Sequence, residues 1–274
     1  MTTPVPDTID APIHVPDETV AAFERDGWAR LSGVFTPDEL APFASGITGA
    51  TLRLNEQTRP MAERTTYDRA FLQVMNLWRR DETARAFVFG QRLARAAADL
   101  LGVRGVRLYH DQSLYKEPSG GITPAHADQF YWPLETDRTV TAWVPLQDTP
   151  SEMGPLGFYT GSQVFDEGRD LPISDESEAR ITASMEAAGF PFEVAPFAVG
   201  DVSFHRGWTF HKAGANRTDR PRSVMTVIYM DADMRLKAPE NPMQENDHAS
   251  WCPGAVPGQV IDTPLNPVLY ERAS

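Results

Sequence analysis

The sequence contains a single cysteine, Cys252, and this scarcity restricts the metal sites that the chain can form. One cysteine cannot make an intramolecular disulfide, and it cannot build a cysteine-rich zinc or iron–sulfur site within the chain. Any metal ion must therefore be held by histidine and carboxylate side chains. The lack of disulfides also fits a reducing compartment, so we expect a cytoplasmic protein.

Basic side chains are scarce as well. The 25 lysines and arginines are outnumbered by 38 acidic residues, which gives a formal net charge of −13. Such a surface repels phosphate backbones and offers no basic stripe to hold one. We therefore expect no nucleic-acid partner, and the same argument disfavours a CoA thioester as substrate.

Long hydrophobic runs are also absent. No stretch approaches the ~18 consecutive apolar residues of a membrane span. Residues 1–18 lack both the basic region and the apolar region of a secretory signal. We expect no membrane partner, and the sequence leaves the oligomeric state open.

The length and hydrophobic content of the chain suit a single domain. Hydrophobic residues make up 41% of the 274 positions, enough for a sizeable core, and we expect one domain over residues 1–274. Residues 1–16, rich in Pro, Thr and Asp, are expected to form an extended arm.

Helical signals dominate the N-terminal part of the chain. Phe23 and Trp28 lie on an amphipathic pattern, and Thr36 to Glu39 is a capping box that opens a helix. From about Tyr67 to Leu101 the apolar spacing again predicts helices, which end near Gly102.

Short β-rich stretches follow, separated by Gly, Pro and Asp turns. This pattern predicts an antiparallel sandwich or jelly roll rather than a βαβ sheet. The expected strands cover residues 107–116, 138–146, 155–159, 192–197, 201–205 and 223–230. The segments 164–190 and 231–257 interrupt the sheet, and we expect them to be loops or short helices at one end of the sandwich.

His126 and Asp128 form the first candidate site. On an extended strand, residues two apart point to the same face, so the imidazole and the carboxylate would converge. A lone His-x-Asp is a weak signal, because it often arises by chance as a surface hydrogen bond. A second histidine from another strand is needed to complete a three-ligand metal site.

That histidine is expected from the segment after the Gly200-Asp201 turn, which contains His205 and His211. Two histidines and one carboxylate occupy one face of an iron octahedron and leave three positions open. Zinc would favour a four-coordinate site with more histidine or cysteine ligands. We prefer His211 over His205 because Arg222 stands 11 residues after it, at the start of an apolar strand.

Arg222 is the candidate anion-binding residue. A buried guanidinium can hold a dicarboxylate co-substrate with two parallel hydrogen bonds, which lysine cannot match. Arg220 is the alternative. It precedes Pro221 in the turn and is expected to be solvated.

Other side chains that could take part in catalysis or binding are expected to have mainly structural roles. His110 and Asp111 are expected to form a hydrogen-bonded pair, with substrate contact as the alternative. Tyr131 and Trp132 follow the metal motif and are expected either to line a pocket or to pack in the core. Cys252 is expected to be inert.

Many short motifs occur in a fixed order along the chain, and together they resemble the phytanoyl-CoA dioxygenase (PhyH) family. They are Phe23 to Trp28, Gly33 to Leu40, Lys116 to Gly120, His126 to Leu134, Thr141 to Leu146, Gly154 to Leu156, Thr160 to Ser162 and His211 to Arg222. The resemblance implies a double-stranded β-helix (a cupin-like jelly roll) with flanking helices.

The resemblance also implies a site. The iron ligands would be His126, Asp128 and His211. Arg222 would bind the C5 carboxylate of 2-oxoglutarate, and Trp143 and Gln112 would line the co-substrate.

The chain departs from the family at one position that matters for this site. The family often has a small hydroxyl residue two positions after the distal histidine, in contact with the co-substrate carboxylate, but this chain has Ala213. We expect Thr139 or Thr141 to supply a replacement donor. Further departures near Ser151 and Gln163 predict an unusual substrate.

The activity that the resemblance implies is an Fe(II)-, 2-oxoglutarate- and O2-dependent oxygenase that abstracts hydrogen from a small-molecule substrate. Asp128 argues against a halogenase, because halogenating relatives replace this carboxylate with a small residue. The composition resembles actinobacterial members that tailor natural products, including the nogalamycin oxygenases. The expected outcome is hydroxylation, epimerisation, ring closure or desaturation.

Two other functions compete with this one. A non-catalytic jelly roll would be expected to lack one of the four groups His126, Asp128, His211 and Arg222. A zinc- or manganese-dependent non-redox enzyme would leave Arg222 without a role. Co-substrate binding by the metal-loaded protein distinguishes the three.

The two long segments, 164–190 and 231–257, are expected to act as lids. Connections of this length inside a compact domain are usually functional covers or disordered. Phe165, Met243 and Trp251 are the residues expected to face the ligand, with packing onto the sheet as the alternative for each. Shortening residues 168–186 is expected to leave iron and 2-oxoglutarate binding intact.

Overall fold

The computed structural model describes residues 7–273. Part of the predicted arm, residues 1–6, lies outside this range. The remainder of the arm is not simply extended, because Asp7–Asp10 form a 3-10 helix and Ile9 and Val15 are buried. The Asp10 carboxylate accepts a hydrogen bond from the backbone of Gln91 at 2.8 Å, which ties the arm to a helix of the body.

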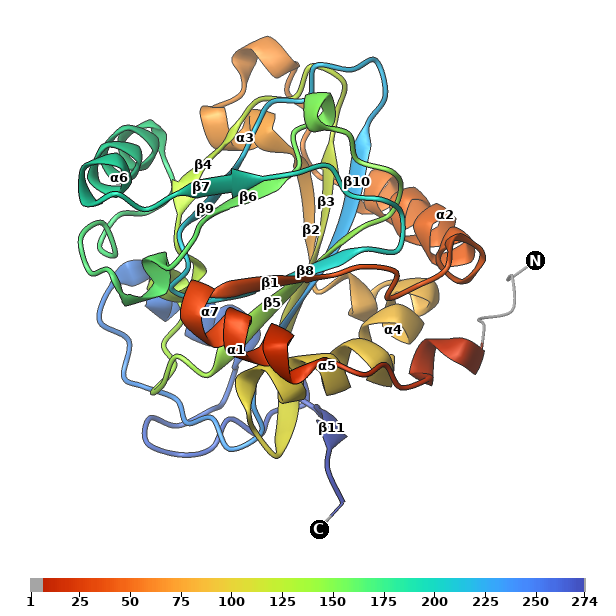
Figure 1. The fold of residues 1–274 in the computed structure, drawn as a ribbon, viewed down its shortest axis with the longest axis vertical. Coiled ribbons are helices and arrows are strands. Elements are labelled where there is room, and N and C mark those ends of the chain that lie inside the picture. Colours follow the sequence, from red (N-terminus) through yellow and green to blue (C-terminus); the bar gives the residue numbers. More distant parts are fainter. Residues whose placement is uncertain (1–6, 274) are drawn as a thin grey trace.

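Two antiparallel sheets face one another, as the sequence predicts (Figure 1). The main sheet has seven strands in the order β1-β8-β5-β10-β3-β11, with β2 also paired to β3. Their bounds are β1 Trp28–Leu31, β2 Leu72–Met75, β3 Gly105–Lys116, β5 Thr139–Pro145, β8 Val202–Arg206, β10 Arg222–Asp231 and β11 Val268–Glu271.

The minor sheet has four strands in the order β4-β9-β6-β7. Their bounds are β4 Thr123–His126, β6 Leu156–Tyr159, β7 Phe192–Val194 and β9 His211–Ala213. These strands are short, and the sequence analysis missed β4 and β9 as separate elements. Both carry residues of the candidate site.

Helices cover the face of the main sheet that turns away from the minor sheet (Figure 1). They are α1 Asp17–Asp26, α2 Pro37–Leu54, α4 Glu82–Val88 and α5 Gln91–Leu101. The predicted capping box opens α2, since Thr36 and Glu39 exchange hydrogen bonds between side chain and backbone. Apolar side chains of these helices and of the sheet's outer face form the largest core cluster. This core holds the sheet rigid and leaves its inner face free for a site.

Two helical predictions are wrong. Trp28 begins strand β1, because Gly27 adopts a left-handed conformation (φ 78°) that ends α1. The expected helix from Tyr67 is interrupted after α3 (Thr66–Ala70) by β2, whose residues alternate between buried and half-buried. Pairing with β3 in the main sheet outweighs the helical spacing of the apolar residues in this segment.

The segments 164–190 and 231–257 each contain one longer helix, α6 (Asp175–Ala188) and α7 (Pro242–Trp251). They lie in different places. Helix α6 packs against β4 of the minor sheet, and α7 packs against Asp128–Tyr131, a short 3-10 helix here called η4. Among residues 7–273, no helix has the length and apolar character needed to cross a bilayer.

Candidate metal centre and co-substrate pocket

A cavity of about 480 Å³ opens between the two sheets. The inner face of the main sheet forms one wall, and β4, β9 and the inserted segments form the others. All of the residues predicted to carry chemistry line it: His126, Asp128, His211, Arg222, Trp143 and Gln112. The fold therefore gathers in one space residues that are far apart in the sequence.

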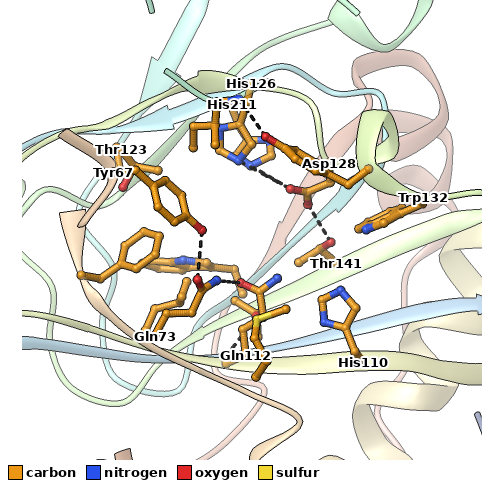
Figure 2. A pocket seen from close by; sticks show the side chains of 18 of the residues that line it. Tyr67, Gln73, His110, Gln112, Thr123, His126, Asp128, Trp132, Thr141 and His211 are labelled. Carbon is orange, nitrogen blue, oxygen red and sulfur yellow. Dashed lines mark hydrogen bonds and ion pairs between the residues drawn. The ribbon is translucent and has the colours of Figure 1, made fainter. Parts of the chain in front are cut away.

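His126, Asp128 and His211 form a cluster suited to a metal ion. One ligand atom from each lies within 4.8 Å of the others. Asp128 Oδ1 is 3.5 Å from His126 Nε2 and 3.7 Å from His211 Nε2. Figure 2 shows the three side chains pointing toward one another at one end of the pocket. The three donors face a common point.

The convergence has a different origin from the predicted one. His126 ends β4, but Asp128 already belongs to η4, so the two do not share a strand. The two histidines meet because His126 pairs directly with His211 across β4 and β9. Residues opposite one another in an antiparallel pair project to the same face.

Backbone carbonyls orient both imidazole rings. Nδ1 of His126 lies 2.7 Å from the carbonyl oxygen of Pro124, and Nδ1 of His211 lies 2.9 Å from that of Thr209. A carbonyl only accepts, so each Nδ1 carries the hydrogen and each Nε2 presents its lone pair to the cavity. Burial, reinforced by His126, lowers the pKa of His211 well below its usual range. Its imidazole is therefore neutral and able to bind a metal.

Two residues of the main sheet hold the Asp128 carboxylate in place. Thr141 donates to Oδ2 at 3.1 Å, and His205 Nε2 lies 3.2 Å from the same oxygen. Thr141 and His205 are opposite one another on β5 and β8. Burial alone would raise the pKa of Asp128, but His211, His126 and His205 outweigh burial and hold it well below its usual range.

His205 was the alternative metal ligand in the sequence analysis. In the structure it contacts Oδ2 of Asp128 and is not part of the three-residue cluster. The two histidines differ in the sheet that carries them: His205 lies near the end of main-sheet strand β8, whereas His211 begins minor-sheet strand β9, opposite His126.

Arg222 is a buried cation without an acidic partner among residues 7–273. Its side chain is only 1% exposed, Nη1 donates to the carbonyl of Gly154, and Nε has no partner in the described chain. Burial lowers the pKa of Arg222 to about 9, and no acidic group among residues 7–273 counteracts this. Arg220 is exposed, as predicted.

A second buried basic side chain lies beside it. Lys116 pairs with Arg222 across β3 and β10, and its Nζ donates to the carbonyl of Gly121. Burial, together with the charge of Arg222, lowers the pKa of Lys116 to about 6. Burying positive charge without compensation costs several kcal/mol. This end of the cavity therefore favours an anionic ligand.

Trp143 and Gln112 lie in one row across the main sheet. Thr226 on β10 pairs with Gln112 on β3 and with Trp143 on β5, so all three project into the cavity. The Arg222 guanidinium lies 5.4 Å from the Trp143 ring.

A hydrogen-bond chain fixes Gln112. Its Oε1 accepts from Gln73 at 2.9 Å, and Gln73 accepts from Tyr67 at 3.0 Å. Figure 2 shows this chain across the pocket from the histidines. The sequence analysis missed Tyr67 and Gln73 because it did not predict strand β2, whose pairing with β3 places Gln73 within reach of Gln112.

Thr139 and Thr141, the residues expected to replace the missing hydroxyl at position 213, both donate their hydroxyls to other side chains. Thr139 donates to Gln129 at 2.7 Å, and Thr141 donates to Asp128. The hydroxyl near Ala213 is that of Thr123, which pairs with Ala213 across β4 and β9. Thr123 lines the cavity, and its Oγ1 is buried without a hydrogen-bond partner in the described chain.

The inserted segments line the opposite side of the cavity. Met243 and Trp251 face it, as expected, together with Asn246 and Asp247 from α7. From the segment 164–190 only Pro172 and Ile173 do so. Phe165 is not among the described lining residues, because it packs against Phe190 with ring centroids 5.2 Å apart. The expectation for Phe165 was therefore wrong.

The side chains of His110 and Asp111 do not form the expected pair. Asp111 points to the other face of the sheet and accepts from the backbone of Leu77 at 2.9 Å. His110 lines the cavity near Trp251, with ring centroids 5.2 Å apart. Tyr131 and Trp132 also line the cavity.

Cys252 is buried, and burial raises the pKa of its thiol, as expected for an inert residue.

The model of the phytanoyl-CoA dioxygenase (PhyH) family matches residues 23–224, so the chain belongs to this family. It is 27% identical over 144 residues to phytanoyl-CoA dioxygenase domain-containing protein 1 of Danio rerio, a match that covers 50% of each chain. It is 26% identical over 133 residues to a probable alpha-ketoglutarate-dependent hypophosphite dioxygenase of Stutzerimonas stutzeri, covering 47% of this chain and 46% of that protein. The chain thus matches about half the length of these two relatives.

Matches to solved structures cover a larger share of the chain. The epimerase SnoN, in complex with Fe3+, alpha ketoglutarate and nogalamycin RO, is 25% identical with a TM-score of 0.77, and the match covers 93% of this chain and 98% of SnoN. The carbocyclase SnoK from nogalamycin biosynthesis is 24% identical with a TM-score of 0.76, covering 94% of this chain and 99% of SnoK. The predicted jelly-roll fold and family resemblance are confirmed.

Proposed function

We propose that this protein is an Fe(II)- and 2-oxoglutarate-dependent oxygenase that acts by hydrogen abstraction on a small-molecule substrate. One observation carries the proposal: a His–Asp–His cluster and an arginine without an anionic partner in the described chain open into the same buried cavity. A metal site alone would not need the arginine. An anion site alone would not need three converging ligands.

The donor set suits iron. Two neutral nitrogen donors and one carboxylate on a single face leave three coordination positions for a bidentate 2-oxo acid and dioxygen. When bound, iron and 2-oxoglutarate supply oxygen activation, which consumes the 2-oxo acid and releases succinate and CO2. The side chain at position 128 is a carboxylate already held by Thr141 and His205, which leaves no place for a halide ligand.

The chain's own residues bind and orient the co-substrate. Arg222 holds the distal carboxylate, which offsets the cost of burying the guanidinium. Trp143 forms the wall beside it, and Gln112 is presented in a fixed orientation by Gln73. We assign to Thr123 the hydroxyl donor that position 213 lacks, because its Oγ1 is buried in the cavity and unpartnered.

The substrate belongs to the kind of compound handled in natural-product tailoring, of polyketide or anthracycline type. The likeness to a carbocyclase and an epimerase of nogalamycin biosynthesis supports this. The wide, partly aromatic wall formed by Tyr131, Trp132 and Trp251 suits a bulky ring system. Hydroxylation, epimerisation and ring closure all begin with the same hydrogen abstraction and differ in how the substrate is held afterwards.

Turnover of the co-substrate tests the proposal. Purified protein with Fe(II), ascorbate and 2-oxoglutarate in air should slowly form succinate, and Asp128→Ala should abolish this. Asp128→Ala also serves as the background control, since it removes one metal ligand. Absence of both 2-oxoglutarate binding and succinate formation in the iron-loaded wild type would overturn the proposal.

A further inference from the structure

The side of the cavity away from Arg222 contains a buried carboxylate. Asp247 is 8% exposed and lines the cavity. It lies on α7, where Met243, Asn246, Asp247 and Trp251 are spaced so that they share one helical face. The helix is anchored at its start by Asn241, which caps Gln244, and by Gln244, which donates to the carbonyl of Phe130. The position of Asp247 is therefore fixed by the fold.

Asp247 has no cationic partner among residues 7–273. The hydroxyl of Tyr109 donates to its Oδ2 at 3.3 Å. Burial raises the pKa of Asp247 to about 7, although hydrogen bonds from Tyr109 and Trp251 oppose the shift. A carboxylate in such surroundings gains stability from any positive charge placed beside it.

The neighbouring side chains do not provide that charge. Burial lowers the pKa of His110 to about 4, so its imidazole is neutral. Tyr131, Trp132 and Trp251 add aromatic surface to the same side of the cavity. A carboxylate beside aromatic rings is the arrangement that proteins use to hold ammonium groups.

The overall charge favours the same ligand. A chain with a net charge of −13 attracts cations from solution and repels anions. The two ends of the cavity also differ in charge: Arg222 favours an anion at one end, and Asp247 favours a cation at the other. A substrate with an amine would be directed to the α7 side and kept away from Arg222.

From this we infer that the substrate carries a basic amine, and that Asp247 binds this amine as an ammonium group against the aromatic wall formed by Tyr131, Trp132 and Trp251. The inference rests on the proposed function, since it assigns the substrate class for the same site. It makes Asp247 a specificity-determining residue. Asp128 and Arg222 remain responsible for the metal and the co-substrate.

A matched pair of probes tests the inference without knowledge of the substrate. 2-Phenylethylamine and 2-phenylethanol share a ring and differ in the charged group. Their affinities for the iron- and 2-oxoglutarate-loaded protein, measured without oxygen by NMR titration, should favour the amine by about tenfold or more, as expected for a charge-assisted hydrogen bond. Asp247→Asn, which preserves the shape of the side chain, should reduce the ratio to near one.

Glu245→Gln is the matched control. Glu245 is exposed on the same helix, so this change removes one negative charge from α7 without altering the cavity. The preference for the amine should persist in this variant. The inference is overturned if the wild type shows no preference for the amine, or if the preference survives in Asp247→Asn.

The same samples separate this inference from the proposed function. Binding of 2-oxoglutarate to each variant is measured first. If 2-oxoglutarate binds and the amine preference is absent, the substrate class is wrong and the oxygenase assignment stands. If the iron-loaded wild type does not bind 2-oxoglutarate, the proposed function itself fails.

Discussion

The two sides of the cavity are built differently. The co-substrate side is formed by neighbouring strands of the main sheet, where Gln112, Thr226 and Trp143 form a row and Arg222 lies on the same strand as Thr226. The substrate side is formed largely by inserted segments, with α7 contributing Met243, Asn246, Asp247 and Trp251. The sheet side carries the residues that we propose bind 2-oxoglutarate, and the inserted side carries Asp247, which we propose binds the substrate amine.

The difference follows from how each side is held. A row across a sheet is fixed by hydrogen-bond register, since a slip by one residue would turn every side chain to the other face. An inserted helix is attached by fewer contacts and tolerates changes in sequence more readily. We therefore expect substitutions on α7 to alter substrate preference more readily than substitutions on the main sheet.

Loss of a metal ligand should produce the largest effect, because both sides of the cavity depend on the metal. His211→Ala should lower Fe(II) affinity by more than about 100-fold, beyond the range expected for residues that only orient a ligand. His205→Ala should lower it by about 10- to 100-fold, since it removes support from Asp128. Anaerobic calorimetry with Fe(II) measures both, and the reverse order would show that His205 is the ligand.

Arg222→Ala should impair 2-oxoglutarate binding without affecting Fe(II) binding. Loss of a buried carboxylate contact should weaken 2-oxoglutarate binding by roughly 2–5 kcal/mol. Arg220→Ala is the control and should cost under about 1 kcal/mol, because Arg220 is exposed. Fe(II) affinity should stay unchanged in both variants. Similar losses of 2-oxoglutarate affinity in the two variants would contradict the assignment.

Glu178 on α6 tests whether the two insertions differ in role. Its carboxylate accepts from the backbone of Ala125 at 2.7 Å and from Lys212 at 2.8 Å, residues adjacent to His126 and His211. Glu178→Ala should lower stability by about 1–3 kcal/mol, the cost of leaving a donor unsatisfied, and should weaken Fe(II) binding.

The exposed Glu176 on the same helix provides the control for α6. Glu176→Ala should leave both thermal unfolding and Fe(II) affinity unchanged. If Glu178→Ala matches this control, α6 is not a support for the metal strands. The expectation that residues 168–186 can be shortened without effect on iron would then hold.

Thr123→Val should give the smallest effect. Removing its hydroxyl should weaken 2-oxoglutarate binding by about 0.5–1.5 kcal/mol, the net contribution of one hydrogen bond. Thr58→Val, at an exposed position, should leave the affinity unchanged. Titration of the iron-loaded variants with 2-oxoglutarate distinguishes them, and an unaltered affinity in Thr123→Val would remove Thr123 from the site.

Sequence reasoning performed best where the signal was local. The capping box at Thr36, the solvent exposure of Arg220 and the burial of Arg222 follow from neighbouring residues. The β-rich stretches separated by turns predicted an antiparallel sandwich or jelly roll, and the family motifs specified a double-stranded β-helix. The spacing of His126 and Asp128 led to the right pair for a partly wrong reason, because cross-strand pairing with His211 is what brings the histidines together.

What the sequence did not reveal depends on long-range contacts. Strand β2 forms because it pairs with β3. The sequence of residues 72–75 alone does not predict this pairing. Asp247 is an ordinary acidic residue in the sequence. Only its burial within the cavity, beside Tyr109, gives it a role.

The central claim is that the His–Asp–His cluster and Arg222 form one site for iron and 2-oxoglutarate. Anaerobic addition of 2-oxoglutarate to the Fe(II)-loaded protein should produce the visible charge-transfer absorption of an iron-chelated 2-oxo acid. The absorption should be absent in His211→Ala and should require much higher 2-oxoglutarate concentrations in Arg222→Ala. No absorption in the wild type at saturating 2-oxoglutarate, or an identical titration in Arg222→Ala, would contradict the account.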